Sequence, residues 1–261
     1  MRVAGALCFA LLCVGCKPPP DAPHDLDALA SYLFEHLMDE DAAPLEVGVG
    51  NLDVWLDTHF EETSEGYKVT GLTEEAAATL GVDVPDLTNQ IGAAVGYDIA
   101  YPVDDVIDAL LLAPRDELWG EDGEDDVFVR THLSDVECFV DGDCEYYEYD
   151  AYIENYYPLG VSVKMDYRGQ YRWVNTRMGP AIVQRTFLTG DTEVTPEWLK
   201  LLFQSFVSIM FTKDGDTRRL ESGWIVVEIG EAGIPEDFAL NYAIDMMKGQ
   251  GEKITNYLDA Q

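Results

Sequence analysis

The sequence predicts an α+β fold in which a curved antiparallel sheet is wrapped around a long C-terminal helix, after a small helical N-terminal region. Three observations predict it. Hydrophobic residues recur at the helical period between residues 25 and 90, alternate with period two over 91–229, and return to the helical period after 236. With 261 residues and 47% hydrophobic content, the chain is long enough for one large or two small domains. We expect a helical region at 25–90 and the sheet with its helix at 91–261.

The N-terminus predicts export from the cytoplasm. One positive charge comes first, residues 3–14 are apolar, and a Gly-Cys pair follows. This run resembles a bacterial lipoprotein signal, with Cys13 where leucine is usual. The resemblance implies a signal peptide at 1–15, a lipid on Cys16, a proline-rich tether at 16–24, and a place in the cell envelope, at the outer membrane or in the periplasm. A plain secretory signal cut nearby is the alternative.

Two cysteines, Cys138 and Cys144, lie outside the signal and the lipid site. An exported protein meets an oxidising compartment, so we expect them to form a disulfide that closes a turn at Asp141-Gly142. A zinc site is the alternative. No histidine lies near the pair and structural zinc needs four ligands, so the sequence favours the disulfide.

The helical N-terminal region has recognisable start signals. Asp25 is a predicted N-cap for a helix over 26–38. A second short helix is expected at 50–59, and Thr73 opens a third. We expect this layer to pack on the edge of the sheet or over the mouth of a cavity.

The middle of the chain predicts an antiparallel meander. A strand over 91–101 precedes a helix over 103–112 that stops at Pro114. Glycines in Tyr167-Arg168-Gly169-Gln170 and Lys213-Asp214-Gly215-Asp216 predict hairpin turns. Residues 198–203 could begin as a helix instead of a strand. The further strands are expected at 127–133, 146–156, 159–167, 170–178, 181–189, 199–212 and 217–229.

The last helix is predicted to begin after Gly233-Ile234-Pro235. Phe238, Tyr242 and Met246 share one side of it and are expected to lie on the sheet. Gly249-Gln250-Gly251 interrupts the pattern and allows a bend or a break.

The net charge of −34 excludes binding of nucleic acid through overall charge, because such a surface repels phosphate. The acidic stretch 120–126 lacks the ligand spacing of an EF-hand, so we interpret it as a solvated loop, with weak calcium binding as the alternative.

A local excess of basic residues interrupts this acidic background. It predicts either an anion-binding strip or cations that neutralise acids on neighbouring strands, and the second is the more common arrangement. The residues are Lys164, Arg168, Arg172, Arg177 and Arg185.

The motifs of common catalytic centres are not found. The four histidines have no paired spacing, and the sequence has neither a nucleophile elbow nor a glycine-rich phosphate loop. We therefore expect no metal and no cofactor, and name no catalytic residue.

The order strand, short helix, meander and long last helix resembles the START/polyketide-cyclase-like superfamily, also called SRPBCC or helix-grip. The stretch 97–106 is similar to the first strand and helix of that fold. Gly233-Ile234-Pro235, followed by Asn241, looks like its entry into the last helix. The resemblance implies an apolar cavity between sheet and helix that holds a lipid or another hydrophobic small molecule.

Three functions follow as hypotheses. The first is a lipid-anchored binding protein with a hydrophobic ligand, and the second is a structural or protein-interaction lipoprotein with a filled core. The third is an enzyme of the cyclase or hydrolase kind within the same fold, which would need a polar set of residues inside the cavity. For the first, the candidate ligand-binding residues are Trp173, Phe203, Trp224, Phe238, Tyr242 and Met246.

Overall fold

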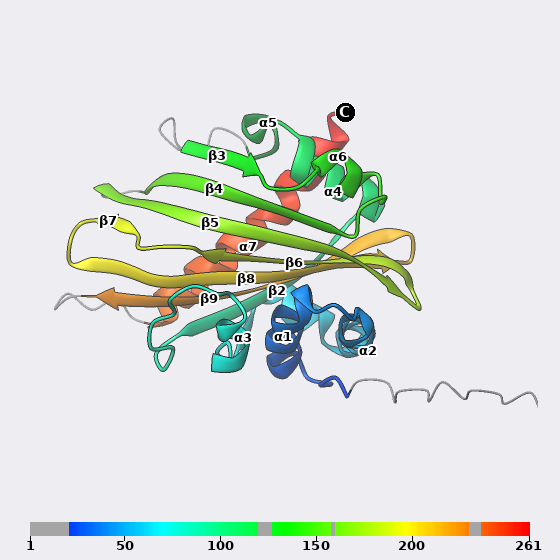
Figure 1. Cartoon of the computed structure of the whole chain (residues 1–261), viewed down its shortest axis with the longest axis horizontal. Helices are drawn as coiled ribbons and strands as arrows, with labels where there is room; N and C mark the ends of the chain where they lie inside the picture. The colour runs from blue at the N-terminus through cyan, green and yellow to red at the C-terminus, as the bar shows by residue number, and fades with distance from the viewer. Residues whose placement is uncertain (1–20, 120–126, 158–159, 230–235) are drawn as a thin grey trace, which may run out of the picture.

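The computed structural model describes residues 21–119, 127–157, 160–229 and 236–261, and it confirms the predicted fold class (Figure 1). The described residues form one antiparallel sheet in the order β1-β2-β9-β8-β6-β5-β4-β3, with β7 paired to β5. The strands are β1 (Tyr67–Val69), β2 (Ile91–Ile99), β3 (Val127–His132), β4 (Tyr146–Tyr157), β5 (Val161–Thr176), β6 (Gly179–Leu188), β7 (Glu193–Thr195), β8 (Leu199–Lys213) and β9 (Asp216–Ile229). The helices are α1 (Leu26–Glu35), η1 (His36–Met38), α2 (Ala43–Glu65), α3 (Glu74–Ala78), α4 (Val103–Leu112), α5 (Arg115–Trp119), α6 (Val136–Val140) and α7 (Glu236–Asp259).

Helices cover both faces of the sheet (Figure 1). One core joins α1, α2 and α3 to β6, β8 and β9, and a second joins α4, α6 and the end of α7 to β4, β5 and β6. The N-terminal helices therefore lie on the face opposite α7, and the expectation that they pack on the edge of the sheet or over a cavity mouth is wrong. Their apolar stripes need a broad apolar surface, which an edge strand does not offer.

Local start signals predict the helix starts well. Asp25 accepts a hydrogen bond from the Ala28 amide at 3.0 Å, and Thr73 accepts one from the Ala76 amide at 3.1 Å. The predicted helix over 103–112 is α4. The second helix is much longer than expected. α2 begins at Ala43, with Pro44 in its first turn, and runs to Glu65.

Two expectations in the meander are corrected. β5 is one strand of 16 residues, so no turn occurs at Gly169. The ring of Tyr149 on β4 occupies the space that a Cβ at Gly169 would need, so the glycine serves packing and not a turn. Residues 199–203 belong to β8 and do not form a helix.

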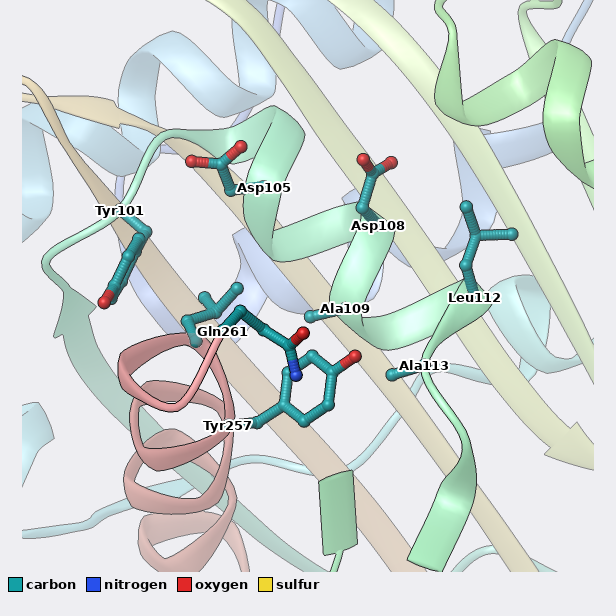
Figure 2. A pocket seen from close by; sticks show the side chains of 9 residues that line it. Tyr101, Asp105, Asp108, Ala109, Leu112, Ala113, Tyr257 and Gln261 are labelled. Carbon is teal, nitrogen blue, oxygen red and sulfur yellow. The ribbon is translucent and has the colours of Figure 1, made fainter. Parts of the chain in front are cut away.

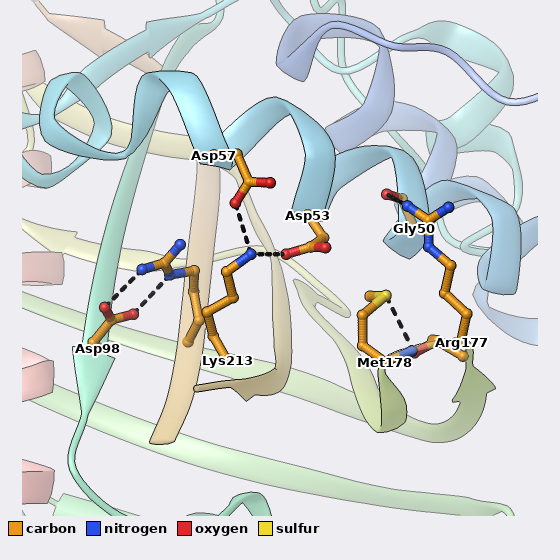
Figure 3. Close-up of polar contacts among 9 residues, drawn as sticks. Gly50, Asp53, Asp57, Asp98, Arg177, Met178 and Lys213 are labelled. Carbon is orange, nitrogen blue, oxygen red and sulfur yellow. Dashed lines mark hydrogen bonds and ion pairs between the residues drawn. The ribbon is translucent and has the colours of Figure 1, made fainter. Parts of the chain in front are cut away.

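The predicted turn between β8 and β9 is confirmed at Asp214 and Gly215, whose φ values are 55° and 99°. Next to it, the Lys213 ammonium lies 2.8 Å from an Asp53 carboxylate oxygen and 2.6 Å from one of Asp57 on α2 (Figure 3). This contact attaches α2 to the hairpin. On the neighbouring strands, Arg218 of β9 makes a bidentate pair with Asp98 of β2, with both distances 2.8 Å.

The last helix is continuous through its glycines, so the break that 249–251 would allow does not occur in α7. Gly251 is buried against the Tyr97 ring of β2. A residue with a side chain at this position would hold that ring away from the helix. The expected stripe is also wrong, because Tyr242 and Met246 are 45% and 51% exposed. The buried or half-buried side is a three-four repeat instead: Leu240, Ala243, Ile244, Met247, Gly251, Ile254 and Leu258.

Among the helices of the described residues, none combines the length and hydropathy that a membrane span requires.

Candidate functional site

The two faces of the central strands differ in exposure. On the face toward the N-terminal helices, Val183, Val207 and Trp224 are fully buried. Along the same strands, some residues on the α7 side, such as Ile182 and Met210, are buried too, but a further set that alternates with the buried valines is only half-buried, although a helix lies over that side of the sheet. The half-buried set is Gln184, Thr186, Gln204, Phe206, Ile225 and Val227. The α7 side of β6, β8 and β9 is therefore not a fully packed core.

A buried pair of opposite charges lies at one end of this face. Arg219 and Glu221 are two residues apart on β9, so both point toward α7, and they are 3% and 5% exposed. An Nη2 atom of Arg219 is 3.6 Å from Oε2 of Glu221. Nε of Arg219 donates to Ser208 Oγ at 2.7 Å, and the Gln250 amide of α7 donates to Glu221 Oε1 at 3.2 Å.

Some buried polar atoms of the charged pair and its neighbours lack a hydrogen-bond partner. Within the described residues, Nη1 of Arg219 and Oε1 of Gln184 make no hydrogen bond. Oε2 of Glu221 has only the ion pair with Arg219, and the Tyr97 hydroxyl interacts with the Glu221 carboxyl. Gln184 and Glu221 are the register partners of Ser208 on its two sides, so the unpaired groups lie around one point of the sheet. Buried polar groups are normally paired, so an unpaired cluster indicates a place for a further polar group.

Burial and the neighbouring charges together shift the pKa values of these groups. Burial raises the pKa of the Glu221 carboxyl, with the Arg219 charge acting against this rise. Burial also raises the pKa of the Tyr97 hydroxyl, which stays protonated and can donate. For Arg219, burial acts to lower the pKa, but nearby Tyr97 and Glu221 raise it overall, so the guanidinium keeps its charge.

An aromatic cluster extends the face across β4 and β5. Tyr147, Tyr149 and Tyr171 are buried with ring centroids 5.7 to 6.1 Å apart. Burial raises the pKa of Tyr147 to about 12, and its hydroxyl lies 2.6 Å from Nδ1 of His132. These rings make a rigid side wall next to Gln184, the register partner of Tyr171.

The six residues predicted to bind a ligand do not form one site. Phe203 and Trp224 lie on the opposite face, packed with the N-terminal helices, and the Trp224 indole donates to the Thr70 carbonyl at 2.8 Å. Trp173 is on the α7 side, but its indole donates to the Phe139 carbonyl at 2.8 Å. Tyr242 and Met246 are on the outer side of α7, and the Phe238 side chain lies outside the described residues.

Two arginines of the predicted anion strip attach α1 to the sheet. Arg172 and Arg185 are buried, with exposures of 1% and 2%. Arg185 donates to the Phe34 carbonyl at 2.9 Å, and Arg172 donates to the Leu37 and Asp39 carbonyls at 3.3 and 2.7 Å. The Phe34 carbonyl is in the last turn of α1 and the other two follow its end, where a cation is favourable.

The other bases of the strip are also in contact with the protein. Arg168 pairs with Asp150 on the neighbouring strand at 2.9 Å, and Lys164 pairs with Glu154 at 3.3 Å. Arg177 is exposed and reaches the Gly50 carbonyl at 3.5 Å (Figure 3). The geometry favours neutralisation and helix attachment over an anion strip.

The predicted disulfide between Cys138 and Cys144 is present, and the chain turns at Gly142 with φ 74°. The predicted lipid site at Cys16, the acidic stretch 120–126 and the helix entry at 233–235 lie outside the described residues. In the part of the chain that the structure describes, no three His, Cys, Asp or Glu side chains are grouped to hold a metal ion.

A pocket of about 420 Å³ lies between α4 and the end of α7 (Figure 2). Asp105 and Asp108 project from α4, and Tyr257 of α7 lies below them. Burial raises the pKa of Asp108, and the nearby carboxylates of Asp105 and Asp104 raise it further. Because these carboxylates make the pocket electronegative, it disfavours anionic ligands.

The polar cluster was not identified from the sequence. Arg219 and Glu221 alternate with Leu220 and Ser222 in a strand that was predicted correctly. Two charges at spacing two on one face of an otherwise apolar strand are the signal that could have identified it.

No family model matches this chain, and no curated protein matches it significantly. The lipid transfer and protein localization domain of human StarD13 (DLC2) matches with 11% identity and a TM-score of 0.38, over 79% of this chain and 95% of that one. A STAR-related lipid transfer protein fragment from Xanthomonas axonopodis matches with 13% identity and a TM-score of 0.41, over 74% and 92%. Ara h 8.0201 matches with 12% identity and a TM-score of 0.39, over 66% and 100%.

Proposed function

We propose that this protein is a membrane-anchored lipoprotein of the bacterial cell envelope that binds an elongated hydrophobic small molecule between its sheet and α7. The observation that carries the binding proposal is the half-buried α7 side of β6, β8 and β9. A fully packed interface would bury Phe206 and Ile225 as completely as Val207 and Trp224 on the other face. An apolar ligand would bury them.

The dimensions of the face suit a lipid chain. Arg219 and Val227 are eight residues apart on β9, which corresponds to about 26 Å. One leaflet of a bilayer core is about 15 Å thick, so a lipid chain fits along the strand. The buried end at Arg219 would hold the polar group, and the more exposed end at Ile225 and Val227 would be the entrance.

Binding is tested with the purified protein and Nile red, a neutral hydrophobic dye. We expect saturable binding with increased fluorescence, and lipid in an organic extract of the purified protein by mass spectrometry. Ile225→Trp, which fills the entrance, should weaken dye binding at least tenfold. Val54→Trp, at a position on α2 that is 55% exposed, is the matched control and should bind normally.

An empty extract together with no saturable dye binding would reject the binding function. It would favour the alternative, a structural or protein-interaction lipoprotein, which crosslinking in envelope fractions would then examine.

The membrane anchor is tested separately. Cys16→Ser removes the thiol that would receive the lipid, so the variant should move from the membrane to the soluble fraction. Cys13→Ser is the control and should stay in the membrane fraction. Unchanged fractionation of Cys16→Ser would reject the anchor.

A further inference from the structure

We propose that two copies of this chain associate through β3, with their β3 strands paired antiparallel, edge to edge, and Val129 of one copy opposite Val129 of the other. This association is independent of the proposed ligand binding, because β4 and β5 separate β3 from the half-buried face of β6, β8 and β9. Three features of β3 lead to it: its open edge, the direction of its outward backbone groups, and the complementarity of its side chains to a second copy of the same strand.

β3 is an edge strand without the features that usually prevent pairing. Among the described strands, it ends the sheet and is paired only to β4 (Figure 1). β1, at the other end, has three residues, one of which is Lys68, whereas β3 has six residues and contains neither lysine nor proline. Val127 and Val129 of β3 are 37% and 54% exposed. An edge strand of this kind is a template for pairing with another strand.

The backbone groups of β3 that do not meet β4 belong to alternate residues. The Leu133 amide donates to the Glu148 carbonyl at 2.9 Å, and these two residues continue the register of β3 with β4. Because hydrogen-bonded and non-hydrogen-bonded pairs alternate in an antiparallel ladder, the odd-numbered residues of β3 bond to β4. The amides and carbonyls of Phe128, Arg130 and His132 therefore point to the open side, where no described strand meets them.

The side chains of β3 are complementary to a second β3 strand when the pairing is centred on Val129. Val127 then lies opposite Thr131, and the outward backbone groups of Phe128 pair with those of Arg130. β-Branched residues opposite each other stabilise a sheet, and the Arg130 guanidinium already lies 5.4 Å from the Phe128 ring centroid in the same chain. Centring on Arg130 would place two guanidinium groups opposite each other, which disfavours that register.

Charge favours a second copy over a basic partner strand. The net charge of −34 attracts basic proteins in general, but β3 has one cation, Arg130, and no acid. The two acids of β4 that are in register with β3 are Asp150 and Glu154, and they are paired with Arg168 and Lys164. These carboxylates are already neutralised, so the edge suits its own sequence better than a basic one.

The register is tested by cysteine crosslinking in the full chain. Val129 would form a non-hydrogen-bonded pair with its counterpart, in which the Cα atoms are about 4.5 Å apart, within the span of a disulfide. Val129→Cys should therefore give a disulfide-linked dimer after mild oxidation, which a reducing agent separates. Val127→Cys is the control in the same strand, because its counterpart is about 13 Å away, and it should not crosslink. Val54→Cys is the control for exposure, since Val54 on α2 is 55% exposed, and it should not crosslink either.

The strength of the association is measured by sedimentation of the unmodified protein in detergent over a range of concentrations, where we expect a reversible dimer. Val129→Lys places two ammonium groups opposite each other and should raise the dissociation constant of the dimer about tenfold. Val54→Lys adds the same charge on α2 and should not change it. Because the two copies repel each other through net charges of −34 each, we expect added salt to strengthen the dimer.

Three results would overturn the association. One is a protein that stays monomeric at every concentration and gives no crosslink from Val129→Cys. Another is a dimer that Val129→Lys weakens no more than Val54→Lys, or that Val127→Cys crosslinks as well as Val129→Cys, since the copies would then meet elsewhere or in another register. The third is a crosslink from Val129→Cys to a different protein in envelope fractions, which would assign the edge to a foreign strand.

Discussion

The contact between Gly251 of α7 and Tyr97 of β2 predicts opposite effects of the same substitution at two neighbouring glycines. A Cβ at Gly251 would lie 2.7 Å from one Tyr97 ring carbon and 3.0 Å from two others, well inside the normal carbon contact of about 3.5 to 4.0 Å. A Cβ at Gly249 would meet nothing within 4 Å. In a helix interior, replacing glycine by alanine stabilises the fold by about 1 kcal/mol, and this helix-propensity effect applies at both positions. At Gly251, overpacking costs about 1–3 kcal/mol, which offsets or exceeds that gain.

Gly249→Ala is therefore expected to be about 1 kcal/mol more stable than the unmodified protein. Gly251→Ala should be less stable than Gly249→Ala by about 1–3 kcal/mol, because the propensity gain is common to both and only the ring contact differs. The assay is urea unfolding followed by tryptophan fluorescence, with the melting temperature as a second readout. About 2 kcal/mol corresponds to roughly 4–8 °C for a chain of this size. Equal stability of the two variants would refute the packing of α7 on Tyr97.

Two further predictions concern stability. Gly169→Ala should destabilise the protein by about 1–3 kcal/mol, because the new Cβ overlaps the Tyr149 ring; a variant as stable as the unmodified protein in urea would contradict the close approach of β4 and β5. A hydrogen bond from Lys213 lowers the pKa of Asp57, so this pair stabilises the fold above the ordinary aspartate pKa and loses its effect as pH falls through the lowered value. Asp57→Asn should therefore cost at most about 1 kcal/mol at pH 7, since Asp57 is 53% exposed, and the difference should vanish in acid; a constant difference down to pH 2 would contradict it.

Features that depend on neighbouring residues could be predicted from the sequence. The caps at Asp25 and Thr73, the helix after Pro102 and the turn at Asp214-Gly215 all form from a few adjacent residues. The positions of the strands could be predicted because apolar residues alternate with period two. The prediction of a turn at Gly169, within β5, was wrong. A glycine within a strand has the same local signal whether it turns the chain or admits a ring from a neighbouring strand.

The candidate site could not be predicted in this way. The sheet is covered on both faces, so β8 and β9 carry large apolar residues on both sides. Trp224 and Phe203 looked like ligand-binding residues because of their size, yet they pack against the N-terminal helices.

By itself, the sequence determined the α+β class, the order of the main elements and the pairing of Cys138 with Cys144, because periodicity, capping and cysteine content are local or compositional properties. Only the tertiary structure decided which face of each strand meets which helix. It also placed Arg219 and Glu221 beside Gln184 and under α7, since strand register and helix position join residues that are far apart in the chain.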